Sequence, residues 1–396
     1  MQSSKTPTGK TLLQKILKSN QHQKTMQRLT LVFSDIEVGI GNNTDDFVEE
    51  DLFCETLRSN FHYSKNYQID LVLNGDILDF LKAPYQGAHP RHVTEKISLW
   101  KLEHMHKAHP KFFNVLHEFI NLENTRIIYI IGNHDYNIIY SKIKKKFREY
   151  VFKELPINKK RIVFPGFEFK SYQVLFEHGS QLDQFFKVDP KNLIHPKIQT
   201  IVEEPFLLFP WGYNALKEHL ILIKEEFPVL ERVFPTNKTL NMLDNQVKKR
   251  VILDTFFYML KSFFFTQFRY KQDKLYNFTW EDFKKYMHNF LRKDYEIKFE
   301  DKAEIKLLSG RFKVISYGHN HVSALYKIKG KYILNTNTWR DEYQYSEETK
   351  TYNPTKKSYG FIIHDKKKIH DLKLHYVKSK QKPLKPSEIK GLKIYK

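Results

Sequence analysis

Cysteine is nearly absent from this sequence, which has one such residue, Cys54, among 396. A single cysteine excludes an intramolecular disulfide and a cluster of thiolate metal ligands. We therefore expect a reducing, cytoplasmic environment and Cys54 as a small core residue. Long apolar runs are also missing. The densest stretch, 256–268, is interrupted by Lys261 and Gln267, and the basic N-terminus lacks the features of a signal peptide, so we expect no transmembrane or targeting segment.

Acidic residues are scarce beside basic ones. The chain has 45 Asp and Glu against 66 Lys and Arg, which gives a formal net charge of +21. This excess favours anionic partners, namely a phosphorylated substrate, nucleic acid or an anionic membrane surface. A solvated basic surface with no specific polyanion partner accounts for the same charge. Because the sequence contains no nucleic-acid-binding motif such as Cys/His fingers, a nucleic-acid partner has no further support.

The hydrophobic content is high enough for a sizeable core, at 41% of the chain, with 15% aromatic residues. Short β-rich runs at 29–34, 68–74 and 126–131 alternate with helical periodicity at about 47–60 and 92–122. This β-α-β-α-β order is typical of an α/β fold. Further strand patterns lie at 161–164, 172–176, 312–317, 331–334, 359–363 and 368–376.

These patterns divide the chain into five segments: a basic N-terminal arm, the first part of a core, a helical insertion, the second part of the core and a basic tail. Their bounds are 1–28, 29–182, 183–309, 310–377 and 378–396. Helical spacing within the insertion is clearest at 247–268 and 280–291. We expect the tail, which is rich in Lys and Pro, to be frayed.

Polar residues follow five of the apolar runs directly. They are Asp35 and Glu37, Asp76 and Asp79, Asn133 and His134, His178, and His319 and His321. Each residue alone fits a cap or a turn. Since loops at the carboxyl ends of strands form the ligand crevice of an α/β sheet, the residues can also converge there. Carboxylate, amide and imidazole groups together suit Mn²⁺, Fe or Zn²⁺, and a pair of such ions can bind phosphate and activate water.

The motifs around these residues resemble those of the calcineurin-like metallophosphoesterases. That family has Asp-x-His, Gly-Asp-x-x-Asp, Gly-Asn-His-Asp/Glu, a later His-Gly, and Gly-His-x-His. In the same order, this sequence has Asp35-Ile-Glu37, Gly75-Asp-Ile-Leu-Asp79, Gly132-Asn-His-Asp135, His178-Gly179 and Gly318-His-Asn-His321. The resemblance covers about 29–182 and 310–365. It implies an αββα sandwich of mixed sheets, with the helical insertion as a cap.

The resemblance also implies a site with two divalent metal ions. Mn²⁺ is the preferred metal, and Fe, Zn²⁺ and Mg²⁺ are alternatives. One ion would be held by Asp35, Glu37, Asp76 and His321, and the other by Asp76, Asn133, His178 and His319. His134 would act on the leaving oxygen of the substrate and would be oriented by Asp79. Asp135 would accept structural hydrogen bonds rather than bind metal.

Glu37 departs from the family, which has histidine at this position. A glutamate oxygen is a harder ligand than imidazole and adds a negative charge, so it would shift the preference toward Mg²⁺ or Mn²⁺. The alternative is a weakened or empty first metal site. The acidic pair Asp45-Asp46 follows this motif and would either orient the ligands or cap the next helix.

The first functional hypothesis is metal-dependent hydrolysis of a phosphomonoester, a phosphodiester or a pyrophosphate. The sequence is distantly similar to the UDP-diacylglucosamine pyrophosphatase branch, which also has a helical insertion. The motif departures and the extra length leave the natural substrate open, with lipid-like or lipid-linked substrates and nucleotide substrates as alternatives. The phenylalanine stripe in 256–268 would then pack against neighbouring helices, form an apolar groove over the site, or place the protein at a membrane surface. Arg91 is a candidate phosphate clamp. The alternatives are a nuclease or protein phosphatase of the same fold, and a catalytically impaired phosphate-binding module.

Overall fold

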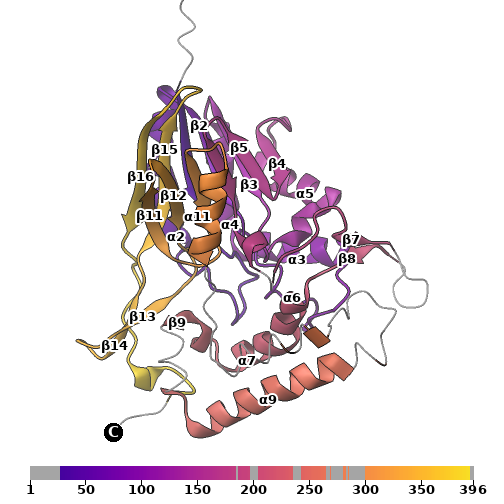
Figure 1. Cartoon of the computed structure of the whole chain (residues 1–396). Helices are drawn as coiled ribbons and strands as arrows, with labels where there is room; N and C mark the ends of the chain where they lie inside the picture. Colours follow the sequence, from indigo (N-terminus) through magenta and orange to yellow (C-terminus); the bar gives the residue numbers. More distant parts are fainter. Residues whose placement is uncertain are drawn as a thin grey trace, which may run out of the picture.

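The computed structural model describes residues 27–183, 186–196, 204–234, 242–264 and 299–392, together with residues 268, 280, 281 and 284. Two β-sheets pack face to face at its centre, and helices cover their outer faces (Figure 1). This arrangement confirms the predicted α/β class and the αββα sandwich of mixed sheets. The predicted N-terminal arm lies outside the described residues, except for Gln27 and Arg28.

The first sheet has six strands in the order β16-β15-β1-β2-β3-β4, and β1 to β4 run parallel. The strands are β1 Arg28–Phe33, β2 Gln68–Asn74, β3 Thr125–Ile130, β4 Ile162–Gly166, β15 Lys357–His364 and β16 Ile369–Val377. The buried Val, Ile and Leu runs of β1, β2 and β3 are typical of strands covered on both faces. The helices packed in the same apolar core are α2 Glu50–Arg58, α3 Glu95–Ala108, α4 Pro110–Asn121 and α5 Ser141–Phe152.

The second sheet has five strands in the order β11-β12-β10-β6-β5, of which β6, β10 and β12 run parallel. The strands are β5 Glu168–Ser171, β6 Val174–Glu177, β10 Val314–Tyr317, β11 Ser323–Ile328 and β12 Lys331–Thr336. Helix α11, Phe299–Ser309, covers the outer face through Ala303 and Leu307, which are buried. Residues 299–309, assigned to the insertion from the sequence, thus pack on the core; the domain division itself stays a prediction.

The interface between the sheets is an apolar layer supplied by both. Its buried members are Val32, Val72, Ile128, Ile130, Val174, Phe176, Val314, Leu334 and Ile362. Because this layer locks the two sheets together, it fixes the ends of β1, β2 and β3 relative to those of β6 and β10. The five polar motifs follow these five strands.

Two local predictions need correction. The helical pattern at 92–122 is split into α3 and α4 because Pro110 starts a new helix after His109. Proline lacks the amide hydrogen that a helix interior requires and disfavours helical backbone at the residue before it. Helix α5 and strands β5, β11, β13 Tyr343–Ser346 and β14 Thr351–Pro354 were not predicted.

The insertion forms a cap of helices below the sandwich in Figure 1, and we use the word cap for residues 211–234 and 242–264. Its helices are α6 Trp211–Ala215, a π-helix η4 at Leu216–Leu220, α7 Ile221–Glu226, a 3₁₀ turn η5 at Leu230–Arg232, and α9 Asn245–Phe264. Short strands β7 Ile194–His195 and β8 Phe206–Leu207 pair with each other, and β9 Val233–Phe234 pairs with β13. Four further 3₁₀ turns are η1 Phe61–Lys65, η2 Tyr136–Ile139, η3 Ser180–Leu182 and η8 Pro386–Glu388.

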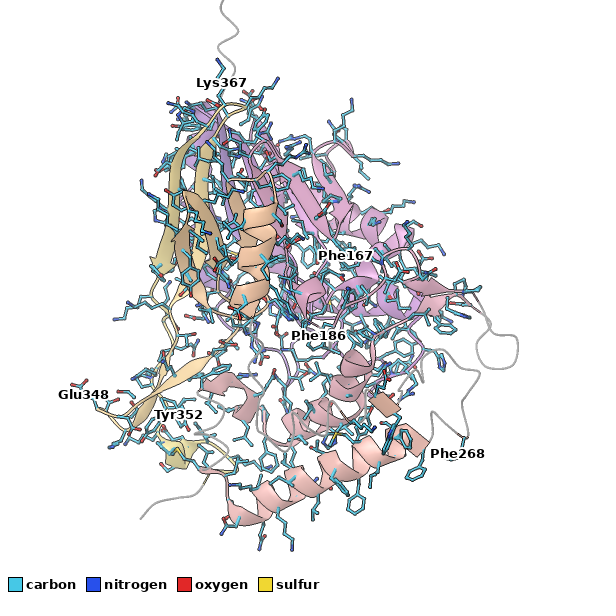
Figure 2. The ribbon with its side chains drawn as sticks, in the orientation of Figure 1. Phe167, Phe186, Phe268, Glu348, Tyr352 and Lys367 are labelled. Atoms are coloured by element: carbon cyan, nitrogen blue, oxygen red, sulfur yellow. The ribbon has the colours of Figure 1, made fainter. Side chains whose placement is uncertain are left out.

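The phenylalanine stripe is largely exposed. Phe257, Phe264 and Phe268 have 61%, 55% and 77% of their surface exposed, and Phe268 lies at one end of the cap in Figure 2. The stripe therefore does not serve as the buried face of a packed helix, which was one prediction. Most of the helix predicted at 280–291 lies outside the described residues. None of the described helices has the length and apolarity needed to cross a membrane.

The C-terminal segment packs onto the core, so the prediction of a frayed tail is wrong for residues 378–392. Ser379 Oγ donates a hydrogen bond of 2.7 Å to Glu49 Oε2. Ile389 and Leu392 are buried in an apolar cluster that includes Tyr352 of β14. The two aliphatic side chains are the part of this Lys- and Pro-rich sequence that anchors it.

We expect Ile389→Ala to lower the free energy of unfolding by about 2–5 kcal/mol, because it removes a buried aliphatic side chain and leaves a cavity. Lys382→Ala, at an exposed position of the same segment, should change it by less than about 0.5 kcal/mol. Urea unfolding followed by circular dichroism measures both. Equal stability of the two variants would mean that the segment is not anchored as described.

Candidate metal centre

The five polar motifs lie on loops that leave β1, β2, β3, β6 and β10, and several of their residues have a left-handed backbone. The φ angles of Asp35, Glu37 and Asp76 are 51°, 55° and 52°, and those of His319 and His321 are 73° and 55°. Left-handed backbone at residues other than glycine costs of the order of 1–3 kcal/mol each and is common at functional sites. Since the surrounding structure holds five such residues in one place, the loops are shaped for a purpose other than stability.

The structure brings together all nine residues predicted for the site. Asp76 Oδ2 lies 3.0 Å from His178 Nε2, and the same nitrogen lies 3.2 Å from Asn133 Oδ1. Asp76, His178 and His319 each offer one ligand atom, and these three atoms lie within 4.8 Å of one another. The second ligand set predicted from the sequence is therefore assembled in space, while its binding of a metal stays a prediction.

The first predicted set lies next to the second. His321 Nε2 is 3.3 Å from Asp35 Oδ1 and 3.6 Å from Glu37 Oε1. Asp35 Oδ1 is also 3.9 Å from His178 Nε2, which joins the two sets. Carboxylate and imidazole groups with such spacing are suited to share divalent cations.

Each of the three histidines has one ring nitrogen fixed by an acceptor outside the two sets. His178 Nδ1 lies 3.0 Å from the carbonyl oxygen of Asn74. His321 Nδ1 lies 2.7 Å from Glu342 Oε1, and His319 Nε2 lies 3.1 Å from Asp183 Oδ2. An acceptor at one ring nitrogen places the N–H there and leaves the other nitrogen as a ligand, which is the usual arrangement of metal-binding histidines. The donor set thus fits metal ions.

Two motif glycines are required by the close approach of the ligands. A Cβ atom on Gly132 would lie 2.1 Å from Asp76 Oδ1, and one on Gly318 would lie 2.3 Å from Asp35 Oδ2. Both distances are far below van der Waals contact. These glycines therefore belong to the motifs because any side chain would displace a carboxylate.

His134 and Asp79 form the pair predicted for catalysis, with His134 Nδ1 3.0 Å from Asp79 Oδ1. Burial lowers the pKa of His134, but the carboxylates of Glu37, Asp76 and Asp79 outweigh this effect and raise that pKa to about 9. Burial and carboxylates act in the same opposed way on His178, whose pKa is also raised to about 9. The raised values show that the cluster favours positive charge, the same property that would attract metal cations.

Asp135 has the structural role expected from the sequence. Its carboxylate accepts hydrogen bonds from the backbone N–H of Ile77 and Gly132, at 2.9 and 2.6 Å, and from Tyr129 Oη at 2.8 Å. Burial and the charge of Asp76 raise its pKa to about 7. These contacts hold the loops after β2 and β3 against each other.

Glu37 is wholly buried and surrounded by positive charge. Its Oε2 lies 2.5 Å from Lys82 Nζ, and its Oε1 lies 3.5 Å from an Arg340 nitrogen. Burial raises the pKa of Glu37, but Lys82 and Arg340 outweigh burial and hold that pKa well below its usual value. Among the described residues, Oε1 has no hydrogen-bond partner. A buried carboxylate oxygen without a hydrogen bond, facing His321, has the character of a vacant ligand atom.

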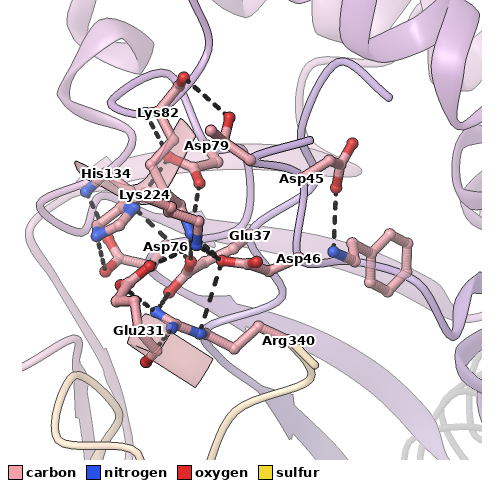
Figure 3. Close-up of polar contacts among 12 residues, drawn as sticks. Glu37, Asp45, Asp46, Asp76, Asp79, Lys82, His134, Lys224, Glu231 and Arg340 are labelled. Atoms are coloured by element: carbon pink, nitrogen blue, oxygen red, sulfur yellow. Dashed lines mark hydrogen bonds and ion pairs between the residues drawn. The ribbon is translucent and has the colours of Figure 1, made fainter. Parts of the chain in front are cut away.

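Asp46 is the centre of a buried ion-pair network that joins the core to the cap (Figure 3). Lys82 of the core and Lys224 of the cap both form ion pairs with its Oδ2. Arg232 Nε, also from the cap, lies 2.5 Å from Oδ1, and Arg340 Nε lies 3.9 Å from Oδ2. Asp46 therefore contacts Lys82 and Arg340, which in turn contact Glu37, and its role in orienting the ligands stays a prediction.

Asp45 binds loop backbone and a histidine, and it does not cap a helix. Its Oδ2 accepts from Gly41 N at 2.7 Å and lies 2.8 Å from His109 Nε2. Helix α2 begins later, at Glu50, with Glu49 at the N-cap position. The alternative that Asp45 or Asp46 caps this helix is therefore wrong.

An apolar cavity of about 220 Å³ lies beside the site, between the core and the cap. His134 and Lys82 form part of its wall. Most of the remaining lining is aliphatic and comes from the cap: Leu216, Leu220, Ile221, Ile223, Leu230, Leu243 and Val251, with Leu81 from the core and Phe227. None of the described phenylalanines of the predicted stripe lines this cavity. Arg91, the candidate phosphate clamp, is instead held by the carboxylate of Glu218.

The sequence analysis missed the charged residues that hold the ligands. Lys82, Arg340, Glu342 and Asp183 each contact a predicted ligand directly, but none belongs to a motif. Lys82 could have been noticed, because it is the lone basic residue in the apolar run that follows Asp76. The pairing of Glu342 with His321 had no visible signal in the sequence.

Comparison with known proteins gives no family assignment. No protein-family model matches the sequence, and no curated protein matches it. A structure of a provisionally assigned 5′-nucleotidase from Staphylococcus aureus aligns at 11% identity and a TM-score of 0.32, over 90% of this chain and 55% of that one. A phosphopantetheinyl hydrolase from Mycobacterium tuberculosis aligns at 11% identity and a TM-score of 0.23, over 79% of this chain and 90% of that one. This chain spans about half the length of the first protein, and neither alignment is close enough to carry a functional argument.

The contact between His109 and Asp45 predicts a pH dependence of stability. Burial lowers the pKa of His109, but the hydrogen bond with Asp45 and the nearby carboxylate of Glu50, 3.7 Å away, outweigh it and raise that pKa to about 9. The unfolded value is about 6.5. The stabilisation is therefore complete below pH of about 6.5 and is lost as the pH rises through about 9.

We expect the stability advantage of the wild type over His109→Gln to shrink by up to about 3 kcal/mol between pH 6 and pH 9.5. Urea unfolding at the two pH values measures the difference. His62→Gln, at an exposed histidine, is the control and should show no such change. A difference between wild type and His109→Gln that is independent of pH would contradict the assignment.

Proposed function

We propose that the protein is a metal-dependent hydrolase of phosphate esters, a metallophosphoesterase with two divalent ions. The observation that supports this best is the convergence of carboxylates, an amide oxygen and three histidines, each histidine with one ring nitrogen already fixed by an acceptor. Asp35, Glu37, Asp76 and His321 would hold one ion, and Asp76, Asn133, His178 and His319 the other. Oxygen-rich ligands favour Mn²⁺, with Fe, Zn²⁺ and Mg²⁺ as alternatives.

When bound, the ions would supply charge neutralisation for the phosphate and activation of the attacking water. Side chains of the protein would orient the proton donor and supply the proton to the leaving oxygen. His134 keeps its Nδ1 on Asp79, and its Nε2, which lies 4.0 Å from Asp76 Oδ2, faces the ligand cluster. In this orientation Nε2 can donate a proton to the leaving oxygen as the ester bond breaks. Asp79 holds the ring of His134 in place through this contact.

The apolar cavity beside His134 suggests what the organic part of the substrate is. Pockets that enclose a whole small ligand measure about 300–1,000 Å³, and this cavity, at about 220 Å³, is smaller. It suits a portion of a substrate, and its aliphatic lining suits an alkyl or acyl portion. We therefore favour a phosphate ester that carries an aliphatic group, a class that includes the lipid-like substrates left as an alternative by the sequence.

One observation favours a second function. Because Glu37 already pairs with Lys82, the first ion has a competitor for this ligand, and loss of that ion would leave a phosphate-binding module with impaired catalysis. The kinetic experiment that follows distinguishes hydrolysis of a phosphate ester from phosphate binding without turnover.

We expect the purified protein with Mn²⁺ to hydrolyse nitrophenyl phosphate mono- or diesters. Asp76→Ala and Asn133→Ala should lower kcat/KM by at least about 100-fold, and His134→Gln should lower kcat by about 10²–10⁴-fold. Glu347→Ala, at an exposed position far along the chain from every motif, serves as the control with unchanged kinetics. If the wild type and all variants turn over at the same rate, the proposed centre is ruled out. If the protein binds phosphate without turnover, the second function is supported.

A series of alkyl nitrophenyl phosphate diesters, from methyl to octyl, tests the aliphatic substrate. We expect kcat/KM to rise up to about fourfold for each added methylene, since burial of one methylene is worth about 0.8 kcal/mol. Val251→Phe, which fills the cavity, should flatten this series. Ile252→Phe is the matched control because Ile252 lies next to Val251 on α9 but is 44% exposed, and it should keep the wild-type slope. A flat series for the wild type would exclude the cavity as a substrate site.

A further inference from the structure

The two oxygens of the Glu37 carboxylate have different surroundings. Oε2 lies 2.5 Å from Lys82 Nζ and makes a hydrogen bond with it. Oε1 makes no hydrogen bond among the described residues and lies 3.6 Å from His321 Nε2. An Arg340 nitrogen is 3.5 Å from Oε1, but the same nitrogen is nearer to Glu231, at 3.1 Å. One oxygen of Glu37 is thus occupied, and the other remains available on the side of the ligand cluster.

Lys82 is held at this place by three carboxylates. Its Nζ lies 2.5 Å from both Glu37 Oε2 and Asp46 Oδ2, and 3.0 Å from Asp79 Oδ2. Its backbone N–H also donates to Asp79 Oδ1 at 2.9 Å. The side chain is 5% exposed, so its ammonium group cannot exchange these partners for water. The position of this charge is fixed by the fold.

We propose that Lys82 converts Glu37 into a one-atom ligand of reduced negative charge for the first metal ion. The ammonium group holds Oε2 and offsets part of the negative charge of the carboxylate, since the same group also contacts Asp46 and Asp79, so that Oε1 alone faces the ion. This inference rests on the two-ion centre proposed above. It explains how glutamate can serve at this position without adding a second ligand oxygen to the site.

The same ammonium group connects the metal ligand with the proton donor. Lys82 contacts Asp79, whose other oxygen lies 3.0 Å from His134 Nδ1. Lys82 is therefore a positioning residue for both halves of the centre, and it also forms part of the wall of the apolar cavity. A consequence is that residues 37 and 82 depend on each other. A histidine at 37 would remove one of the three carboxylates that offset the charge of Lys82, and the ammonium group would then repel the first ion more strongly.

A double-mutant cycle in metal binding tests the proposal without reference to activity. The variants are Glu37→His, Lys82→Met and the combination of both, and calorimetry with native mass spectrometry gives the number of Mn²⁺ ions bound to the metal-free protein and their affinities. We expect two ions for the wild type and for the double variant. Glu37→His alone should bind one ion, with the other weakened at least about tenfold. Lys82→Met alone should bind two ions, one of them more tightly than the wild type does.

Arg232→Met is the matched control. It also removes a buried cation from Asp46, but Arg232 does not touch Glu37, so both ions should bind with affinities within about twofold of the wild type. Glu37→Gln, which keeps the size of the side chain, repeats the cycle in a second form. Circular dichroism and thermal unfolding establish that each variant is folded.

Three outcomes would overturn the inference. If Glu37→His alone binds two ions as tightly as the wild type, Lys82 does not compensate Glu37. If the wild type binds one ion and still hydrolyses phosphate esters, Lys82 excludes the first ion instead of supporting it, and the proposed function survives on the second ion set. If the wild type binds no ion and hydrolyses no ester, the proposed function itself fails together with the inference.

Discussion

The arrangement of this protein depends on the compensation of buried negative charge at the ends of its strands. Asp35, Glu37, Asp46, Asp76 and Asp79 all lie at most 2% exposed, and a carboxylate without a partner at such depth is strongly destabilising. Lys82, Arg340 and the cap residues Lys224 and Arg232 balance part of this charge. The remainder is concentrated where three histidines meet.

The apolar framework and the polar centre were visible in the sequence to different degrees. Buried strand runs such as 29–34 and 68–74 were recognisable because most of their side chains are apolar. The nine residues predicted for the site come together because the motifs follow strands whose ends are fixed by the two sheets. Their identity as metal ligands and catalytic groups stays a prediction, since proximity alone does not establish what binds.

What the sequence could not reveal are contacts between residues far apart in the chain. Lys82 and Glu37 are 45 residues apart in the sequence. Glu342 contacts His321, and strands β11 and β12 lie between these two residues in the sequence. No periodicity encodes such pairs, because each depends on where whole loops lie. The prediction of a frayed tail was wrong for a different reason. The composition of this segment is that of a solvated segment, but the side chains of Ile389 and Leu392 are buried and hold it in place.

The network around Asp46 has a consequence for how ligands enter and leave. Lys224 and Arg232 come from the cap, yet both neutralise a carboxylate of the core that is wholly buried. Swinging the cap away would remove two of the four cationic partners of Asp46 at once and leave it with Lys82 and Arg340. Because the loss of partners is costly for a buried carboxylate, this network favours a cap that keeps its position over the core while ligands exchange.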